Sequence, residues 1–245
     1  MNKASILTIN VFILICCLAI DAYCAAGTGV LIDPGHSPRS GGTVSCGGKS
    51  EYLYNDALAE AVLLFLRAKN IPAGLTRSKQ ENITMSGRTG KSGKSRLLLS
   101  LHHDSVQPQY VYAQSTGQGY CSDKARGFSI FVSRKNSHYR ESVQYAEALG
   151  AALIRKGLTP SLHHAEPIKG ENRELLSADK GIYIFDDLLI LKNAKTPALL
   201  LEAAVIVNPH EALISGTDAY RLIISEAVYE ILDKGKISHA PKAGH

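Results

Sequence analysis

Short apolar runs alternate along this chain with longer segments that are apolar on one side only. The runs predict buried strands at residues 29–32, 73–76, 96–102, 127–132 and 196–202. Apolar residues at helical spacing predict helices at residues 55–69, 142–156 and 220–232. A further short helix is expected after Asn208, with Pro209 in its first turn. Strands that alternate with helices indicate an α/β fold, here a single-domain mixed twisted sheet flanked by helices on both faces.

Polar segments separate these elements. Residues 37–50, 77–95 and 106–126 are rich in Gly, Ser or other polar residues and are predicted as loops, the last a long one. Residues 158–180 are also polar, and we interpret them as a lid over a site. Residues 181–191 are largely apolar.

The N-terminus has the layout of a secretory signal peptide. Lys3 precedes an apolar run over residues 4–20, and small residues follow at 21–27, with cleavage expected after Cys24 or Ala26. The run is short for a bilayer span of roughly 20 residues, which disfavours a retained anchor. A buried helix is a further alternative, and bulky Tyr23 disfavours lipid attachment at Cys24. We therefore expect an exported, periplasmic or secreted protein without a stable membrane anchor.

Composition excludes some function classes. The chain has 245 residues, 45% of them hydrophobic and 20% charged, so it can bury a sizeable core. Its formal net charge is +5, but no Lys/Arg block or basic-aromatic interleaving supports nucleic-acid binding. The mild basic excess suits an acidic polymer, although ordinary solubility also explains it. We expect a monomer.

Four chemistry-bearing side chains lie where predicted strands and helices begin or end. His36, His102 and Glu202 follow predicted strands, and Glu51 lies at a loop-to-helix junction. Ligands of open α/β sheets bind beyond the carboxyl ends of the strands, so we expect these residues to meet. Taken singly, a His at a strand end is usually structural, and a Glu at a helix start complements the helix dipole. Together they match the ligands of a zinc ion in a hydrolytic site. Such an ion takes three His or acidic ligands and keeps a fourth position open for water.

Residues 30–36 (VLIDPGH) resemble the opening motif of the zinc-dependent N-acetylmuramoyl-L-alanine amidases, a family of cell-wall hydrolases. Glu51, opening a helix that carries Asn55, is similar to their next signature. Residues 100–105 (SLHHDS) and 197–202 (PALLLE) resemble their last two motifs. Further matches to the family pattern are Thr76, Arg77, Arg88, Asn208 and Glu211.

The resemblance runs in order from residue 30 to about residue 232. It implies a zinc amidase catalytic domain at residues 27–236, after a signal peptide at 1–26 and before a flexible tail at 237–245. It implies that Zn²⁺ is held by His36, Glu51 and His102, and that Glu202 is the catalytic carboxylate. The implied reaction is hydrolysis of the amide between N-acetylmuramic acid and L-alanine.

The chain departs from the family pattern in three places. His103-Asp104 replaces an Ala-Asn pair, which offers the metal a competing imidazole. Neighbouring strand residues point to opposite faces, so we keep His102 as the ligand. Ala203-Ala204 replaces a Gly-Phe pair at the pocket floor, and the loop at 106–126 is long.

The cysteines and the other histidines are less specific. Cys46 and Cys121 remain after signal cleavage, and they form either a disulfide at the rim of the site or two free buried thiols. His163 and His164 are expected to be surface or lid imidazoles rather than a second metal site. The histidines without partners at ligand spacing are His138, His210, His239 and His245.

Two other functions fit the same residues. A zinc carboxypeptidase or other peptidase uses a similar ligand set, and a wall-binding module that has lost catalysis is a different class. The sequence shows no wall-targeting repeat, so we expect peptidoglycan to bind the catalytic domain itself or a partner, such as an activator protein.

Overall fold

The computed structural model describes residues 29–79, 81–113 and 119–233. The predicted signal peptide at residues 1–26 and the predicted tail at 237–245 therefore lie outside the described residues. Within the described part of the chain, no helix combines the length and the apolar character that a membrane span requires.

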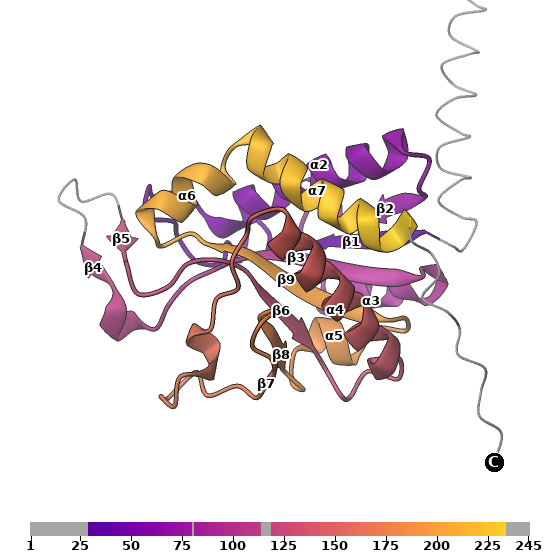
Figure 1. The fold of residues 1–245 in the computed structure, drawn as a ribbon. Helices are drawn as coiled ribbons and strands as arrows, with labels where there is room; N and C mark the ends of the chain where they lie inside the picture. The colour runs from indigo at the N-terminus through magenta and orange to yellow at the C-terminus, as the bar shows by residue number, and fades with distance from the viewer. Residues whose placement is uncertain (1–28, 80, 114–118, 234–245) are drawn as a thin grey trace, which may run out of the picture.

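A seven-stranded mixed sheet forms the centre of the molecule (Figure 1). Its strands are β1 (Val30–Pro34), β2 (Ala73–Leu75), β3 (Leu97–Asp104), β6 (Ser129–Val132), β7 (Leu175–Ser177), β8 (Ile182–Ile184) and β9 (Ala198–Val205). They are ordered β2-β1-β3-β9-β6-β8-β7. Strands β2, β1, β3 and β9 are parallel to one another. Strand β6 is antiparallel to β9, β8 is parallel to β6, and β7 is antiparallel to β8.

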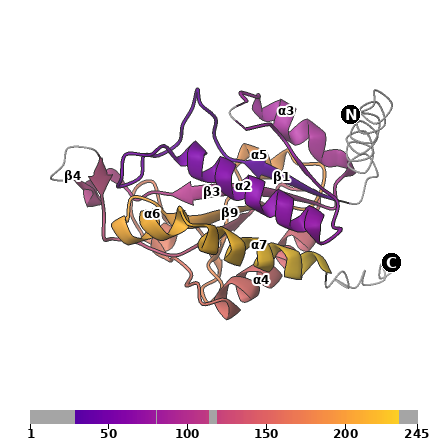
Figure 2. The same cartoon turned by 90° about the horizontal axis from the view of Figure 1, so that it is seen from above.

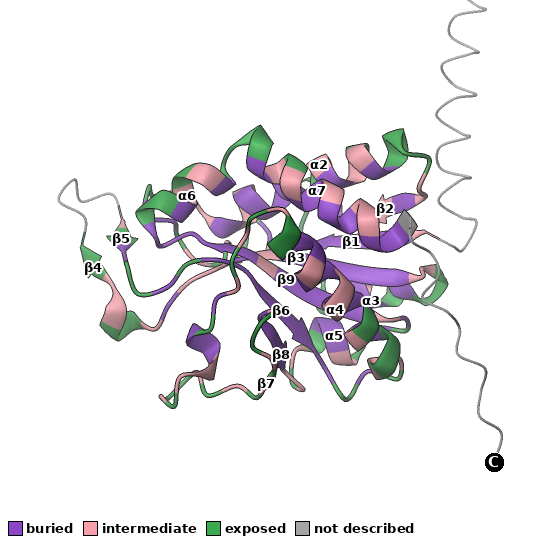
Figure 3. Cartoon of the chain, in the orientation of Figure 1, coloured by how far each residue is buried: buried purple, intermediate pink, exposed green. Residues whose placement is uncertain are grey.

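Both faces of the sheet are buried, which explains the nearly continuous apolar runs in the sequence. In β3, Leu97, Leu99 and Leu101 belong to one apolar cluster, and Leu98 belongs to the opposite one. The first cluster is covered by α2 (Glu51–Ala68), α4 (Tyr139–Arg155) and α7 (Asp218–Asp233), which lie side by side in Figure 2. The second packs against α5 (Leu189–Lys192), which α3 (Met85–Gly90) contacts. Figure 3 shows the central strands of the sheet, such as β3, β9 and β6, as largely buried between these layers. The predicted fold class is confirmed.

Some predicted boundaries were wrong. Helix α2 begins at Glu51 rather than at residue 55, because its first turn buries polar side chains that an apolar pattern does not reveal. The predicted lid at 158–180 contains η3 (His163–Ala165) and strand β7. The predicted loop at 106–126 contains η2 (Pro108–Tyr110), β4 (Tyr112–Ala113) and β5 (Tyr120–Cys121). The remaining elements are η1 (Lys91–Lys94) and α6 (Pro209–Ser215), whose N-terminus is capped by the side chain of Asn208.

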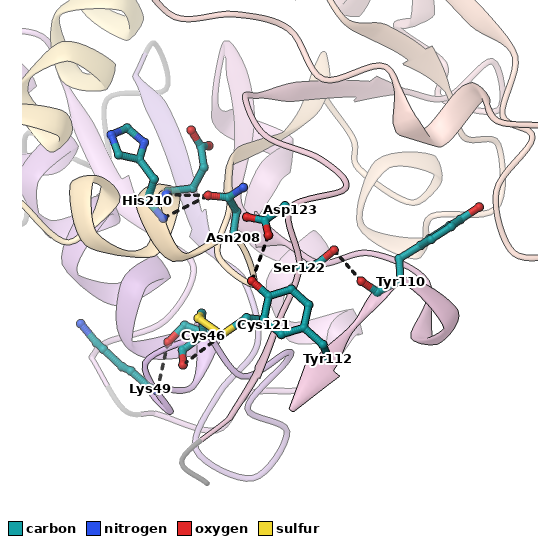
Figure 4. Close-up of a disulfide and its surroundings, with 11 residues drawn as sticks. Cys46, Lys49, Tyr110, Tyr112, Cys121, Ser122, Asp123, Asn208 and His210 are labelled. Carbon is teal, nitrogen blue, oxygen red and sulfur yellow. Dashed lines mark hydrogen bonds between the residues drawn. A yellow bond between two sulfur atoms is a disulfide. The ribbon is translucent and has the colours of Figure 1, made fainter. Parts of the chain in front are cut away.

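Cys46 and Cys121 form a disulfide, so the alternative of two free thiols was wrong (Figure 4). The backbone N–H of Cys46 donates a hydrogen bond to the carbonyl of Ile206, 2.9 Å away. The disulfide therefore joins the loop at 37–50 to strand β5, and the hydrogen bond joins the same loop to the segment that follows β9.

Replacing both cysteines by Ala is expected to lower the free energy of unfolding by about 2–4 kcal/mol. The physical reason is that the bridge closes a sequence separation of 75 residues and so restricts the unfolded chain. Urea denaturation of the full chain, followed by circular dichroism, measures this loss. Dithiothreitol should destabilise the wild type and leave the double variant unchanged; equal midpoints for all samples would contradict the prediction.

Candidate metal centre

The turn after β1 is fixed by a buried carboxylate. Asp33 is 1% exposed and accepts hydrogen bonds from Thr76 Oγ1 at 2.5 Å and Ser100 Oγ at 2.8 Å. Thr76 directly follows β2 and Ser100 lies in the middle of β3, the two strands that flank β1 in the sheet. The end of β1 is therefore tied to both neighbours just before the turn begins.

Two arginines hold the carbonyl groups of the same turn. Arg77 donates to the carbonyls of Pro34 and Gly35, each at 3.2 Å. Arg88 donates to the carbonyl of Pro34 at 2.9 Å and also to that of His36. His36 itself has φ 58°, in the left-handed region that a non-glycine residue adopts at a cost. The guanidinium groups thus stabilise an uncommon backbone conformation that aims the imidazole.

His36, Glu51 and His102 come together at the carboxyl ends of β1 and β3. His36 Nε2 lies 3.1 Å from Glu51 Oε2, and His102 Nδ1 lies 3.1 Å from Glu51 Oε1. Their potential ligand atoms all lie within 4.8 Å of one another. The two imidazole rings meet edge to face, with centroids 5.0 Å apart.

The Glu51 carboxylate is held from several sides. It accepts hydrogen bonds from Thr43 N at 3.1 Å, Asn55 Nδ2 at 3.0 Å and His103 N at 3.2 Å. Burial by itself raises the pKa of Glu51, but its hydrogen bonds with His102 and His36 outweigh burial, so the pKa lies well below its ordinary value. Glu51 is therefore an anion fixed between two imidazoles.

Two glycines leave room for these side chains. A Cβ at Gly35 would overlap the ring of His102, and one at Gly42 would overlap the carboxylate of Glu51. Gly42 also has φ +74°, which favours glycine. The close approach of backbone and ligand side chains therefore depends on glycine at both positions.

His103 does not compete for the centre. Its Nδ1 lies 2.8 Å from Asn55 Oδ1, and the side chain is 2% exposed. Burial lowers the pKa of His103 to about 3, so the ring is neutral at ordinary pH. Asn55 thus orients both Glu51 and His103, a role the sequence did not reveal.

Glu202 lies directly beside the centre. In the sheet it is the register partner of His102 on one side and of Ser129 on the other. Its Oε2 atom is buried and has no hydrogen-bond partner. Burial raises the pKa of Glu202 well above its ordinary value, and the charges of Asp104 and Glu51 raise it further. A buried carboxyl oxygen without a partner needs a task or a cation to justify its cost.

His163 and His164 were expected to be surface or lid imidazoles. They lie in the segment predicted as a lid, but they are buried, so the expectation of surface imidazoles was wrong. They are 7% and 8% exposed, and both Nε2 atoms lie near the Asp104 carboxylate, at 3.3 and 2.8 Å. Burial lowers the pKa of His164, but Asp104 and Glu171 outweigh burial and raise it to about 9. A polar segment rarely signals burial, and Asp104 is about 60 residues away in sequence, so only the fold reveals this cluster.

Within the described part of the chain, His138 and His210 belong to no ligand group. Among the described residues, the groups with metal-ligand spacing are His36/Glu51/His102 and Asp104/His163/His164. His239 and His245 lie outside the described part of the chain.

Comparison with known families decides the class of this site. The family model described as N-acetylmuramoyl-L-alanine amidase matches residues 30–234. The chain belongs to this amidase family. The enzyme class and family expected from the sequence motifs are therefore confirmed.

Individual relatives of this chain, by sequence and by structure, are also amidases. The chain is 26% identical over 218 residues to the N-acetylmuramoyl-L-alanine amidase AmiA of Escherichia coli, covering 82% of this chain and 73% of AmiA. An N-acetylmuramoyl-L-alanine amidase structure from Clostridium difficile 630 superposes with a TM-score of 0.66 at 18% identity, covering 86% of this chain and 97% of the other. The CwlD amidase from Clostridioides difficile, solved in complex with the GerS lipoprotein, gives a TM-score of 0.56 at 17% identity, covering 84% and 96%. These structural similarities support the α/β fold.

Proposed function

We propose that this amidase hydrolyses the amide bond between N-acetylmuramic acid and L-alanine in peptidoglycan, using a zinc ion held by His36, Glu51 and His102. One observation carries the proposal: these three side chains converge within 4.8 Å, beside the unpartnered carboxyl oxygen of Glu202. Family membership supplies the bond that is cut.

The residues present fit zinc. Tetrahedral zinc bonds of about 2.0–2.2 Å separate two ligand atoms by about 3.3–3.6 Å. Glu51 lies 3.1 Å from each imidazole nitrogen, close to that separation. Hydrogen bonds from Asn55 and two backbone N–H groups orient Glu51, as surrounding groups do for metal-binding carboxylates.

Each side chain then has a defined task. A bound zinc ion supplies Lewis acidity, which polarises an amide carbonyl and brings the pKa of water towards about 7. Glu202 accepts the proton of the attacking water and passes it to the leaving amine of L-alanine. The Arg77 and Arg88 contacts to the turn keep the His36 imidazole oriented.

The cellular setting is also part of the proposal. The signal-like N-terminus favours export, and the Cys46–Cys121 disulfide is typical of an oxidising, exported environment. Because the CwlD relative was solved with the GerS lipoprotein, we include an activator protein among the proposed partners. We propose that the chain itself is a monomer.

Purified sacculi provide the test. The zinc-loaded protein is expected to release peptides with a free L-alanine N-terminus and to leave the glycan strands intact. Chelation should abolish release, and added zinc should restore it. Release of terminal amino acids instead would identify a peptidase, and binding without release would identify a wall-binding module.

A variant that lacks one proposed zinc ligand tests the ligand assignment. His36→Ala is expected to abolish peptide release and to lower zinc affinity strongly, because only two ligands remain. His138→Ala, on the N-cap residue of α4, is the control and should keep full activity. Undiminished peptide release by His36→Ala would contradict the ligand assignment.

A further inference from the structure

We propose that Asp104, His163 and His164 form a second metal site, separate from the amidase centre and suited to zinc or a similar divalent transition metal. The proposal does not depend on the amidase reaction. It rests on the geometry, burial and hydrogen bonding of a cluster that joins the end of β3 to the segment at 158–180.

The potential ligand atoms lie close to the spacing that a metal requires. Asp104 Oδ2 lies 3.3 Å from His163 Nε2 and 2.8 Å from His164 Nε2, and all three atoms lie within 4.8 Å of one another. Two imidazole nitrogens and one carboxylate oxygen are a common zinc ligand set, with ligand atoms about 3.3–3.6 Å apart. A small shift of these side chains would place a cation between them.

Both rings are oriented as metal-binding imidazoles usually are. His163 Nδ1 lies 2.8 Å from Ser161 Oγ, and His164 Nδ1 lies 2.8 Å from Glu171 Oε2. Glu171 is fixed in turn by Gln107 Nε2, also at 2.8 Å. When a hydrogen bond occupies one ring nitrogen, the other is directed towards a metal. Here both Nε2 atoms are directed at one carboxylate oxygen.

The cluster is incomplete as a purely hydrogen-bonded network. His163 is 7% exposed, and its buried Nε2 lies 3.3 Å from Asp104 Oδ2 without the geometry of a good hydrogen bond. A buried nitrogen that is poorly satisfied costs free energy, and a metal ion would use its lone pair. A structural ion pair needs only one of the two imidazoles, whereas a metal site accounts for both.

The surroundings give the site rigidity. The His164 ring packs against Phe131 and Tyr183, with centroids 5.0 and 5.6 Å away, on strands β6 and β8. A metal ion there would clamp the segment at 158–180 to β3, two residues after His102.

Metal counting tests the proposal. Full-length metal-free protein is titrated with zinc chloride, and bound zinc is measured after dialysis. We expect two zinc ions per chain in the wild type, one in His163→Ala, one in His36→Ala and none in the double variant. A wild type that binds one ion, which survives in His163→Ala and is lost in His36→Ala, would overturn the second site.

Cobalt provides a second readout that does not depend on activity. In the His36→Ala background, Co²⁺ should produce visible absorption bands of a His-ligated ion, and His163→Gln or His164→Gln should remove them. Circular dichroism verifies that each variant is folded. Bands that persist in both Gln variants, or that never form in folded His36→Ala, would overturn the proposal.

Discussion

Glu202→Gln is expected to slow peptide release from sacculi by about 100- to 10,000-fold, the usual contribution of a general base. The amide is nearly the same size as the carboxylate and should fit the same position, but it cannot accept the proton of the attacking water. Because Glu202 is not one of the three proposed zinc ligands, zinc binding at His36, Glu51 and His102 should persist. Initial rates and zinc content, measured on the same preparations, test both halves of the prediction.

A matched acid provides the control for this variant. Glu226 lies on α7 and pairs with Lys156 at 2.7 Å, away from the carboxyl ends of the strands. Glu226→Gln should therefore retain full activity. If Glu202→Gln released peptide at the wild-type rate, Glu202 would not be the base, even though the metal centre could still be correct.

Arg77→Ala is expected to lower the free energy of unfolding by about 3–5 kcal/mol, the usual cost of leaving one partner of a buried ion pair alone. Arg77 Nη2 lies 2.5 Å from Asp56 Oδ1, and the two side chains are 0% and 1% exposed. The substitution also removes the hydrogen bonds to the carbonyls of Pro34 and Gly35. Peptide release should fall as well, because the turn that carries His36 loses one of its two guanidinium supports.

Urea denaturation of the metal-free protein measures this loss without a contribution from zinc binding. Asp56→Ala/Arg77→Ala should cost less than the sum of the single variants, because no charge is then left buried alone. Lys135→Ala removes an exposed pair with Asp187 and should change stability little. A midpoint for Arg77→Ala equal to that of Lys135→Ala would contradict the structural role.

The residues of the candidate centre could be predicted from the sequence because they lie at the carboxyl ends of neighbouring strands. His36, His102 and Glu202 each follow an apolar run, and the carboxyl ends of parallel strands share one edge of a sheet. Register then makes His102 and Glu202 direct neighbours. Alternation also correctly assigned His103 to the other side of the strand, where it contacts Asn55.

Hydrophobic periodicity and turn residues act over a few positions, so the local sequence alone predicted β1, β2, β3, β6 and β9, the main helices and the residues at their ends. The short strands β4, β5, β7 and β8 were not predicted, because their segments are polar or too short to show a pattern. Only the tertiary structure decided which distant polar groups meet: Arg77 and Arg88 on the β1 turn, Cys46 with Cys121, and Asp104 with His163 and His164. Such contacts depend on how helices and loops pack across the sheet. A polar residue that is buried with a partner reads, along the chain, the same as one exposed to water.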